Sequence, residues 1–199
     1  MQTETGSRTF RATNQPSVRR PEQRQSALER FLALPEGTAC QLIAGEIIMS
    51  PAPIPLHQYI VIHLSAKLLQ FVEAASLGQV FIAPIDVRLN ERSIFQPDIL
   101  FISKEKSALI GERMIEGPPD LVAEVLSPSS AYHDLRTKFR AYEQAGVQEY
   151  WIIDPERKSV EVFVSSGSKF ELRQEAEGEG AAQSVLLAGL SVDLADIFP

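Results

Sequence analysis

The segment DLVAEVLS, residues 120–127, constrains the fold of this chain more than any other part of its sequence. Its alternating positions place apolar side chains on both faces of a β-strand, which predicts a central strand of a sheet that is covered on both sides. Glu124 interrupts this pattern in the middle of the strand. An ionised carboxylate in such a place is strongly disfavoured unless a cation or several hydrogen bonds compensate it. Glu124 must therefore have a partner.

A second acid stands in a similar setting. Asp98 precedes the apolar run of QPDILFI, which predicts another buried strand. If the two strands lie side by side, their carboxylates repel each other, and a divalent cation between them relieves that repulsion. Asp98 and Glu124 are therefore a candidate metal site. The alternative is that each acid forms a separate ion pair with a structural lysine or arginine.

The other segments predict an α/β fold in which helices flank a central mixed β-sheet. Residues 1–25 are polar, carry five arginines against two glutamates, and predict a disordered or loosely attached basic tail. Residues 26–199 form the predicted domain, because Ser26 and Glu29 match the capping box that starts a helix. Longer helices are expected near 56–75 and 131–144, with an N-terminal β-hairpin turning at Ala44-Gly45.

Composition narrows the classes of function. The formal charge of -7 argues against a broad basic face that grips nucleic acid by its phosphates. It does not exclude phosphodiester chemistry, because acidic residues hold the cations of metal-dependent sites. No apolar run reaches the roughly 18 to 20 residues of a membrane span, and the single Cys40 fits a reducing compartment and a place in the core. We therefore expect a cytoplasmic protein without membrane association.

Lys138 is the third candidate of the site. On the helix after Glu124, it falls about 80° from the centre of the apolar stripe, at the border of that stripe. It can therefore reach back over the sheet edge, where an ammonium group beside two carboxylates orients a water and offsets charge on a phosphate. The alternative is an exposed ion pair with Asp134, one turn earlier, worth only a few tenths of a kcal/mol.

Several motifs together resemble the Uma family of restriction endonucleases, in the PD-(D/E)XK nuclease superfamily. They cover about residues 35–165 in the family's order: GEIIMSPAP, His57, QPDILFI, PPDLVAEVLSPSS, Asp134, Lys138, Tyr142 and GVQEYWIIDP. The resemblance implies the restriction-endonuclease-like fold, with Mg²⁺ or Mn²⁺ held at the strand ends. It also implies that Asp98 is the acid of the PD half-motif, Glu124 the second acid, and Glu46 a further acidic ligand.

One position departs from the superfamily pattern. Leu126 stands where that pattern has a lysine, two residues after the second acid, and the resemblance points to Lys138 as its replacement. His57 opens the first long helix and is a supporting candidate. It either hydrogen-bonds Glu46 or takes a plain capping or surface role. Asp134 is the other supporting candidate.

The resemblance and the paired acids together imply a Mg²⁺-dependent endonuclease that hydrolyses phosphodiester bonds of DNA by metal-activated water. The alternative is a catalytically impaired module that keeps the nuclease fold and binds nucleic acid or protein. Leu126 and the acidic composition favour that alternative. A third reading is a metal-dependent hydrolase of another substrate, because a fold does not fix a function.

Two further expectations concern the surface. The apolar stripe from Ile60 to Phe71 and a hairpin joining VEVFV to KFELR offer apolar and strand-edge surface, which predicts a homodimer. The acidic, glycine-rich segment EAEGEGA, residues 175–181, is expected to be a surface loop.

Overall fold

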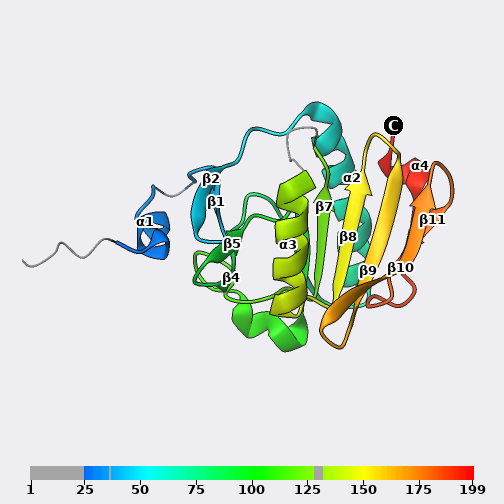
Figure 1. Cartoon of the computed structure of the whole chain (residues 1–199). Helices are drawn as coiled ribbons and strands as arrows, with labels where there is room; N and C mark the ends of the chain where they lie inside the picture. The colour runs from blue at the N-terminus through cyan, green and yellow to red at the C-terminus, as the bar shows by residue number, and fades with distance from the viewer. Residues whose placement is uncertain (1–24, 36, 128–131) are drawn as a thin grey trace, which may run out of the picture.

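The computed structural model describes residues 25–35, 37–127 and 132–199, without the side chains of 132–135. The basic tail predicted for residues 1–25 therefore lies almost wholly outside the described residues. The elements, shown in Figure 1, are α1 Ala27–Leu32, β1 Cys40–Ile43, β2 Glu46–Met49, α2 Pro55–Ala74, β3 Gly78–Ile82, β4 Val87–Asn90, β5 Ser93–Phe95, β6 Ile99–Ser103, the 3-10 helix η1 Lys104–Leu109, β7 Leu121–Val125, α3 Tyr132–Ala145, β8 Glu149–Asp154, β9 Ser159–Ser166, β10 Lys169–Glu177, β11 Ala181–Gln183, β12 Ser191–Asp193 and α4 Leu194–Ile197.

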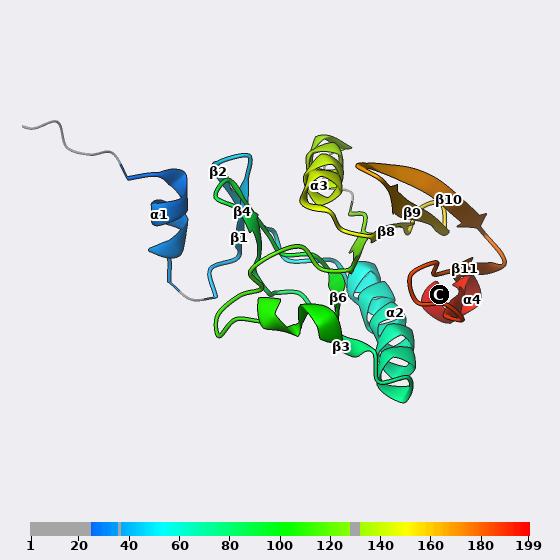
Figure 2. The same cartoon turned by 90° about the horizontal axis from the view of Figure 1, so that it is seen from below.

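A six-stranded mixed sheet in the order β10-β9-β8-β7-β6-β3 forms the centre of the molecule. β7 and β8 run parallel and the other neighbours run antiparallel. Helix α2 covers one face of this sheet and α3 lies over the other, as Figure 2 shows from below. β7 is buried at every position, as its two-sided apolar pattern predicts. The predicted layered α/β fold with a mixed sheet is confirmed.

Helix α2 packs through one apolar stripe. Ile60, Leu64 and Leu68 recur at helical spacing and are fully buried in the core cluster that also holds Leu121 and Trp151. Replacing such a leucine by alanine costs about 2 to 5 kcal/mol. Because this stripe covers the protein's own sheet, it is not available to a second copy. That part of the argument for a homodimer was wrong, and the homodimer itself stays a prediction.

Helix α3 covers the opposite face with aromatic side chains. Tyr142 is fully buried and packs edge-on against Phe95, with the two ring centroids 5.5 Å apart. The helix ends before Gly146, whose φ of 86° and hydrogen bond from its N–H to the carbonyl of Tyr142 make it a C′ glycine. These contacts fix how far α3 lies from the sheet and which of its side chains face it.

The predicted N-terminal hairpin belongs to a separate four-stranded sheet in the order β2-β1-β5-β4. Its turn places Ala44 and Gly45 at positive φ, 52° and 89°, and a glycine takes such values without strain. The helix α1 opens with the predicted capping box of Ser26 and Glu29. Cys40 is buried in the small core beneath this sheet, as predicted.

The C-terminal part extends the core. β10 continues to Glu177 and β11 begins at Ala181, so the expectation of a loop over all of EAEGEGA is wrong for its first three residues and its last. The reason is pairing: Ala176 lies opposite Val160 and is buried, and only the chain after β10 turns away. Leu194 and Ile197 of α4 then pack into the core that α2 covers. Within the described residues, no helix is both long and apolar enough to cross a membrane.

Candidate active site

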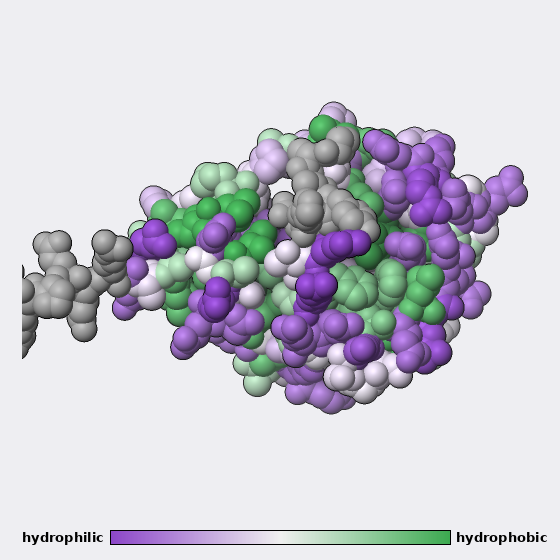
Figure 3. Space-filling view, in the orientation of Figure 1, coloured by the Kyte–Doolittle hydropathy of each residue, from purple (hydrophilic) through white to green (hydrophobic). Residues whose placement is uncertain are grey.

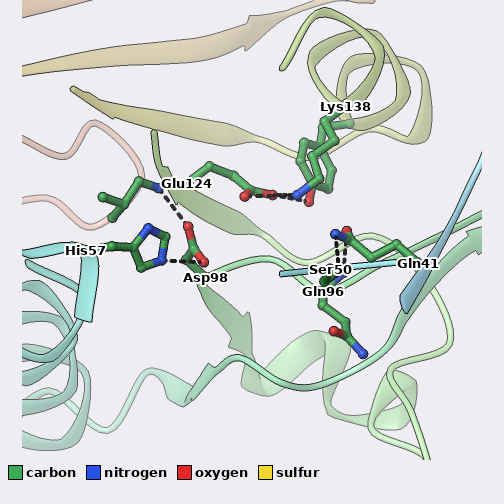
Figure 4. A network of polar contacts seen from close by, with 9 residues as sticks. Gln41, Ser50, His57, Gln96, Asp98, Glu124 and Lys138 are labelled. Carbon is green, nitrogen blue, oxygen red and sulfur yellow. Dashed lines mark hydrogen bonds and ion pairs between the residues drawn. The ribbon is translucent and has the colours of Figure 1, made fainter. Parts of the chain in front are cut away.

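Asp98 and Glu124 meet at one end of the central sheet. β6 pairs antiparallel with β7 so that Ile99 lies opposite Ala123, and one residue further out Asp98 stands across from Glu124. The prediction that both acids come from adjacent buried strands is confirmed. Figure 4 shows their carboxylates at the strand ends, where His57 of α2 lies beside Asp98 and Lys138 of α3 lies beside Glu124.

The partner of Glu124 is Lys138. The lysine ammonium donates to both carboxylate oxygens, with Nζ at 2.9 Å from Oε1 and 3.0 Å from Oε2. The Tyr142 hydroxyl donates to Oε1 at 2.8 Å. The side chains of Lys138 and Glu124 are only 12% and 10% exposed. Lys138 therefore reaches back over the sheet edge as predicted, because its place at the border of the apolar stripe of α3 turns it toward β7.

The pKa of the Glu124 carboxyl is raised by its buried position near a second acid. Burial raises the pKa of the Glu124 carboxyl above its ordinary value of 4.5, and the negative charge of Asp98 raises it further. The charge of Lys138 and the hydrogen bonds from Lys138 and Tyr142 lower the same pKa without cancelling the rise. The carboxylate is thus held in a setting where added positive charge would stabilise its ionised form.

The partner of Asp98 is His57, on the first turn of α2. Nε2 of the imidazole lies 3.1 Å from Oδ1 of Asp98, and the backbone N–H of Val125 donates to Oδ2 at 2.8 Å. Burial lowers the pKa of His57, but the hydrogen bond to Asp98 and the charge of Asp98 outweigh burial and leave that pKa raised. His57 is buried, so a surface role is wrong. Its contact is with Asp98, directly before β6, and Glu46, the partner in the other alternative, is exposed in the separate sheet.

Glu46, another predicted site residue, does not join this group. Glu46 is the exposed first residue of β2 and pairs with Ile43 in the four-stranded sheet. In the described part of the chain, no three histidine, cysteine, aspartate or glutamate side chains gather as a metal-ligand set. The role of Glu46 as a metal ligand stays a prediction. The side chain of Asp134 lies outside the described residues.

A polar network beside the site holds the segment that leads to Asp98. The side chain of Gln41 accepts a hydrogen bond from the backbone N–H of Gln96 at 3.0 Å and donates to the Ser50 hydroxyl at 3.2 Å. The amide of Gln96 in turn donates to Asp86 at 2.9 Å. Figure 4 shows Gln41, Ser50 and Gln96 of this network next to the acids. Sequence reasoning missed it, although the glutamine directly before the PD pair was a signal.

Two aromatic hydroxyls face the acids and were also missed as site residues. Burial, and then the charge of Glu124, raise the pKa of both Tyr142 and Tyr150 well above the ordinary value of 10.0. Tyr142 donates to Glu124, whereas the buried hydroxyl of Tyr150 and Nδ1 of His57 have no hydrogen-bond partner among the described residues. Buried polar atoms of this kind usually pair with water or a ligand.

The donor set fits a hard divalent cation. An ionised carboxylate has about four acceptor positions. Among the described residues, Asp98 accepts two of the hydrogen bonds given above and Glu124 accepts three, so both retain acceptor capacity. Mg²⁺ is typically held by one or two carboxylates together with waters. Asp98 and Glu124 are the residues that would hold it.

Comparison with known proteins shows the family and the fold of this chain. A protein from Synechocystis, the uncharacterized sll1609, is 32% identical over 143 residues, which cover 71% of this chain and 80% of that protein. The crystal structure of a protein from Anabaena variabilis, described as a putative nuclease of the DUF820 group, superposes with a TM-score of 0.72 at 22% identity, over 87% of this chain and 97% of that one. This likeness shows a shared fold. The family model described as "Uma2: Putative restriction endonuclease" matches residues 28–195, and the chain belongs to this family.

Proposed function

We propose that this chain is an endonuclease that hydrolyses phosphodiester bonds of DNA with the help of Mg²⁺ or Mn²⁺. Its family and fold support a nuclease-like function. The observation that carries the finer proposal is the buried ammonium of Lys138 on Glu124, directly beside Asp98. A lysine and two acids at adjoining strand ends are the groups that in-line attack on a phosphodiester requires.

The chain's own residues have separate tasks in this proposal. Lys138 fixes the orientation of Glu124 and places a positive charge where the scissile phosphate gains negative charge. His57 and the backbone of Val125 fix Asp98 in the same way from the other side. Asp98 and Glu124 would hold the divalent cation, which would supply Lewis-acid polarisation of the phosphate and a water of lowered pKa. The Tyr150 hydroxyl, buried beside Tyr142 and without a hydrogen-bond partner among the described residues, is a further donor near these groups.

One observation favours a second candidate, a binding module without catalysis. Leu126 occupies the usual lysine position, and Lys138 already donates to both oxygens of Glu124. In that case the ion pair is only a structural element at the sheet edge. The two candidates differ in whether cleavage occurs and in whether it depends on Lys138.

Cleavage of supercoiled plasmid DNA with Mg²⁺ or Mn²⁺ tests the proposal. We expect nicked or linear product from the wild type and a loss of at least about two orders of magnitude in rate for Asp98→Asn and Lys138→Ala. Lys67→Ala is the matched control, because Lys67 is also a helix lysine paired with an acid, Asp196, but lies on the exposed surface. Equal cleavage by wild type and Lys138→Ala would contradict the assignment, and no cleavage by the wild type would favour the binding module.

Metal binding has a readout that does not depend on activity. A ligand that binds only the folded state stabilises it in proportion to the logarithm of its concentration. Mg²⁺ and Mn²⁺ should therefore raise the melting temperature of the wild type with dose, and isothermal calorimetry should show binding. Asp98→Asn should lose both effects. A wild type whose melting temperature does not respond to either cation would contradict the metal site.

A further inference from the structure

A cleft of about 480 Å³ lies between helix α3 and the four-stranded sheet, outside the Asp98 and Glu124 site. Its lining comes from α3 on one side and from the β1–β2 turn and the start of β5 on the other. Figure 3 shows a strongly hydrophilic strip at the centre of the face that α3 occupies in Figure 1. The lining residues are Ala44, Ser93, Arg136, Thr137, Arg140, Ala141 and Gln144.

The charged residues of this lining are both basic. Arg136 and Arg140 are exposed and stand one helical turn apart, where side chains are about 5 to 6 Å from each other at Cβ. Like charges at this spacing disfavour a helix slightly. A third guanidinium sits at the rim, because Arg92 donates to the backbone carbonyl of Ala44 at 2.9 Å. This local positive charge stands out in a chain whose formal net charge is -7.

We infer that this cleft, with Arg136 and Arg140 as its main contacts, binds the phosphate backbone of duplex DNA. The inference rests on the proposed function, because it names the surface on which that site receives its substrate. Guanidinium groups match phosphate oxygens as two-pronged donors and stay charged at all ordinary pH values. Serine, threonine and glutamine, which complete the polar lining, also commonly contact phosphate or sugar oxygens.

The cleft shares helix α3 and strand β5 with the acidic site. Lys138, which pairs with Glu124, lies about 160° around the axis of α3 from Arg136 and from Arg140, so it faces the sheet while they face the cleft. From the other wall, β5 carries both Ser93 of the lining and Phe95, whose ring packs on Tyr142. The hydroxyl of Tyr142 donates to Glu124. A DNA backbone bound in the cleft would thus contact α3 and β5, the helix and the strand that position Lys138 and Tyr142.

Binding, measured apart from cleavage, tests this inference. The probe is a fluorescein-labelled DNA duplex, and its anisotropy is followed with the full chain in EDTA over a series of salt concentrations. Arg136→Gln/Arg140→Gln should bind roughly tenfold or more weakly, and the slope of log affinity against log salt should fall by about 2. Arg136→Lys/Arg140→Lys should keep the slope and lose part of the affinity. The matched control is Arg113→Gln/Arg173→Gln, which removes two exposed arginines from elsewhere on the surface.

The outcomes separate the inference from the proposed function. If the glutamine double variant melts like the wild type and binds with unchanged affinity and salt slope, the inference is overturned, whatever the cleavage assay shows. An equal loss in the Arg113 and Arg173 control would also overturn it. If the wild type never cleaves but its binding depends on the cleft arginines, the nuclease proposal fails and the inference stands. A wild type that binds no duplex at any salt concentration overturns the inference.

Discussion

Both ends of the central sheet contain buried acids, but the groups that pair with these acids differ between the two ends. At the end where β7 finishes, Glu124 shares its site with Asp98 and is neutralised by the ammonium of Lys138. At the opposite end, Glu149 begins β8 and is fully buried. Its neighbour across the β7–β8 pairing is Leu121, which directly follows another buried acid, Asp120.

Glu149 has no cation among its described partners, and all four of its donors are neutral. Oε1 accepts from the Trp151 indole at 2.7 Å and from the Ser184 hydroxyl at 2.6 Å. Oε2 accepts from the backbone N–H groups of Val185 and Leu186, both at 2.8 Å. This carboxylate ties the C-terminal segment to the sheet. Its acceptor positions are used up, so it has little capacity left for a metal.

The comparison teaches that burial alone does not mark a catalytic acid. A carboxylate saturated by neutral donors is a structural tie. A carboxylate beside a second acid, with its pKa raised by burial and by that neighbour, retains a demand for positive charge. The predictions that follow test this distinction between the Glu124 end and the Glu149 end.

The largest effect should come from changing the cation at the Glu124 end. Lys138→Arg keeps the charge, but the broad planar guanidinium does not replace a compact ammonium in a tight buried site. We expect plasmid cleavage to fall by about two to four orders of magnitude, the range of a lost acid–base or orienting group. Steady-state cleavage rates measure this, with circular dichroism melting as a check of folding. Retention of most of the activity would mean that only the charge of residue 138 matters.

A rescue sharpens the same test. Leu126 lies two residues after Glu124, so a lysine there points to the same face of the strand. In the Lys138→Ala background, which loses the ammonium, Leu126→Lys should restore part of the cleavage. Absence of any rescue in a folded double variant would contradict the view that Lys138 replaces the usual strand lysine.

A substitution of Glu149 should lower the free energy of unfolding and should not affect the chemistry of cleavage. Glu149→Gln keeps the shape of the side chain but turns an amide NH₂ toward backbone donors, which leaves buried N–H groups without acceptors. Each such group costs about 1 to 3 kcal/mol, so we expect a loss of about 3 kcal/mol in the free energy of unfolding. In contrast, Glu124→Gln/Lys138→Met should change it by only about 1 kcal/mol, because replacing a buried ion pair by neutral groups is often tolerated. Urea denaturation compares the two, and equal losses would remove the distinction.

Much of the fold was predictable because local signals agreed with the tertiary structure. The capping box at Ser26, the glycine after α3 and the two-sided apolar strand β7 each determine one element. The strand EYWIID was predictable, but its buried acid Glu149 was missed, since this strand has an acid at each end and none in its middle. Three of the four donors to Glu149 come from Ser184, Val185 and Leu186, far along the chain. Hydrogen bonds between residues that are far apart in the chain leave no local pattern in the sequence.

The candidate site was partly predictable for a related reason. Glu124, Asp98 and Lys138 follow from strand alternation and helix geometry, which the sequence carries directly. The contact of His57 with Asp98 instead depends on how the proline-rich connection sets α2 against the sheet. The placement of Glu46 depends on a hairpin that joins a separate sheet. Neither arrangement produces a periodic residue pattern from which it could be predicted.

A smaller effect is expected from Tyr142→Phe. This change removes the hydroxyl that donates to Glu124 and leaves the ring packing on Phe95 in place. We expect a loss of about 1 kcal/mol in the free energy of unfolding, typical of one hydrogen bond. Since that bond lowers the pKa of Glu124, its loss should raise this pKa further. Urea denaturation and ¹³C NMR titration of the carboxyl carbons measure the two effects, and an unchanged Glu124 titration would contradict the assigned role of the hydroxyl.

The smallest effect concerns pH and His57 in the absence of divalent cations. The folded pKa of His57 lies above its ordinary value of 6.5, mainly through Asp98, so the folded state binds the proton more tightly than the unfolded state. The protonated pair therefore contributes stability that is fully present below pH 6.5 and is lost as the pH rises through the folded value. The free energy of unfolding of the wild type should fall over this window more steeply than that of His57→Gln. His63→Gln is the control, because His63 stacks on Tyr59 with ring centroids 4.1 Å apart and takes no part in the acid site. Identical pH profiles for the wild type and His57→Gln would show that the contact with Asp98 does not depend on protonation, and the imidazole would then act as a neutral hydrogen-bond donor that orients the acid.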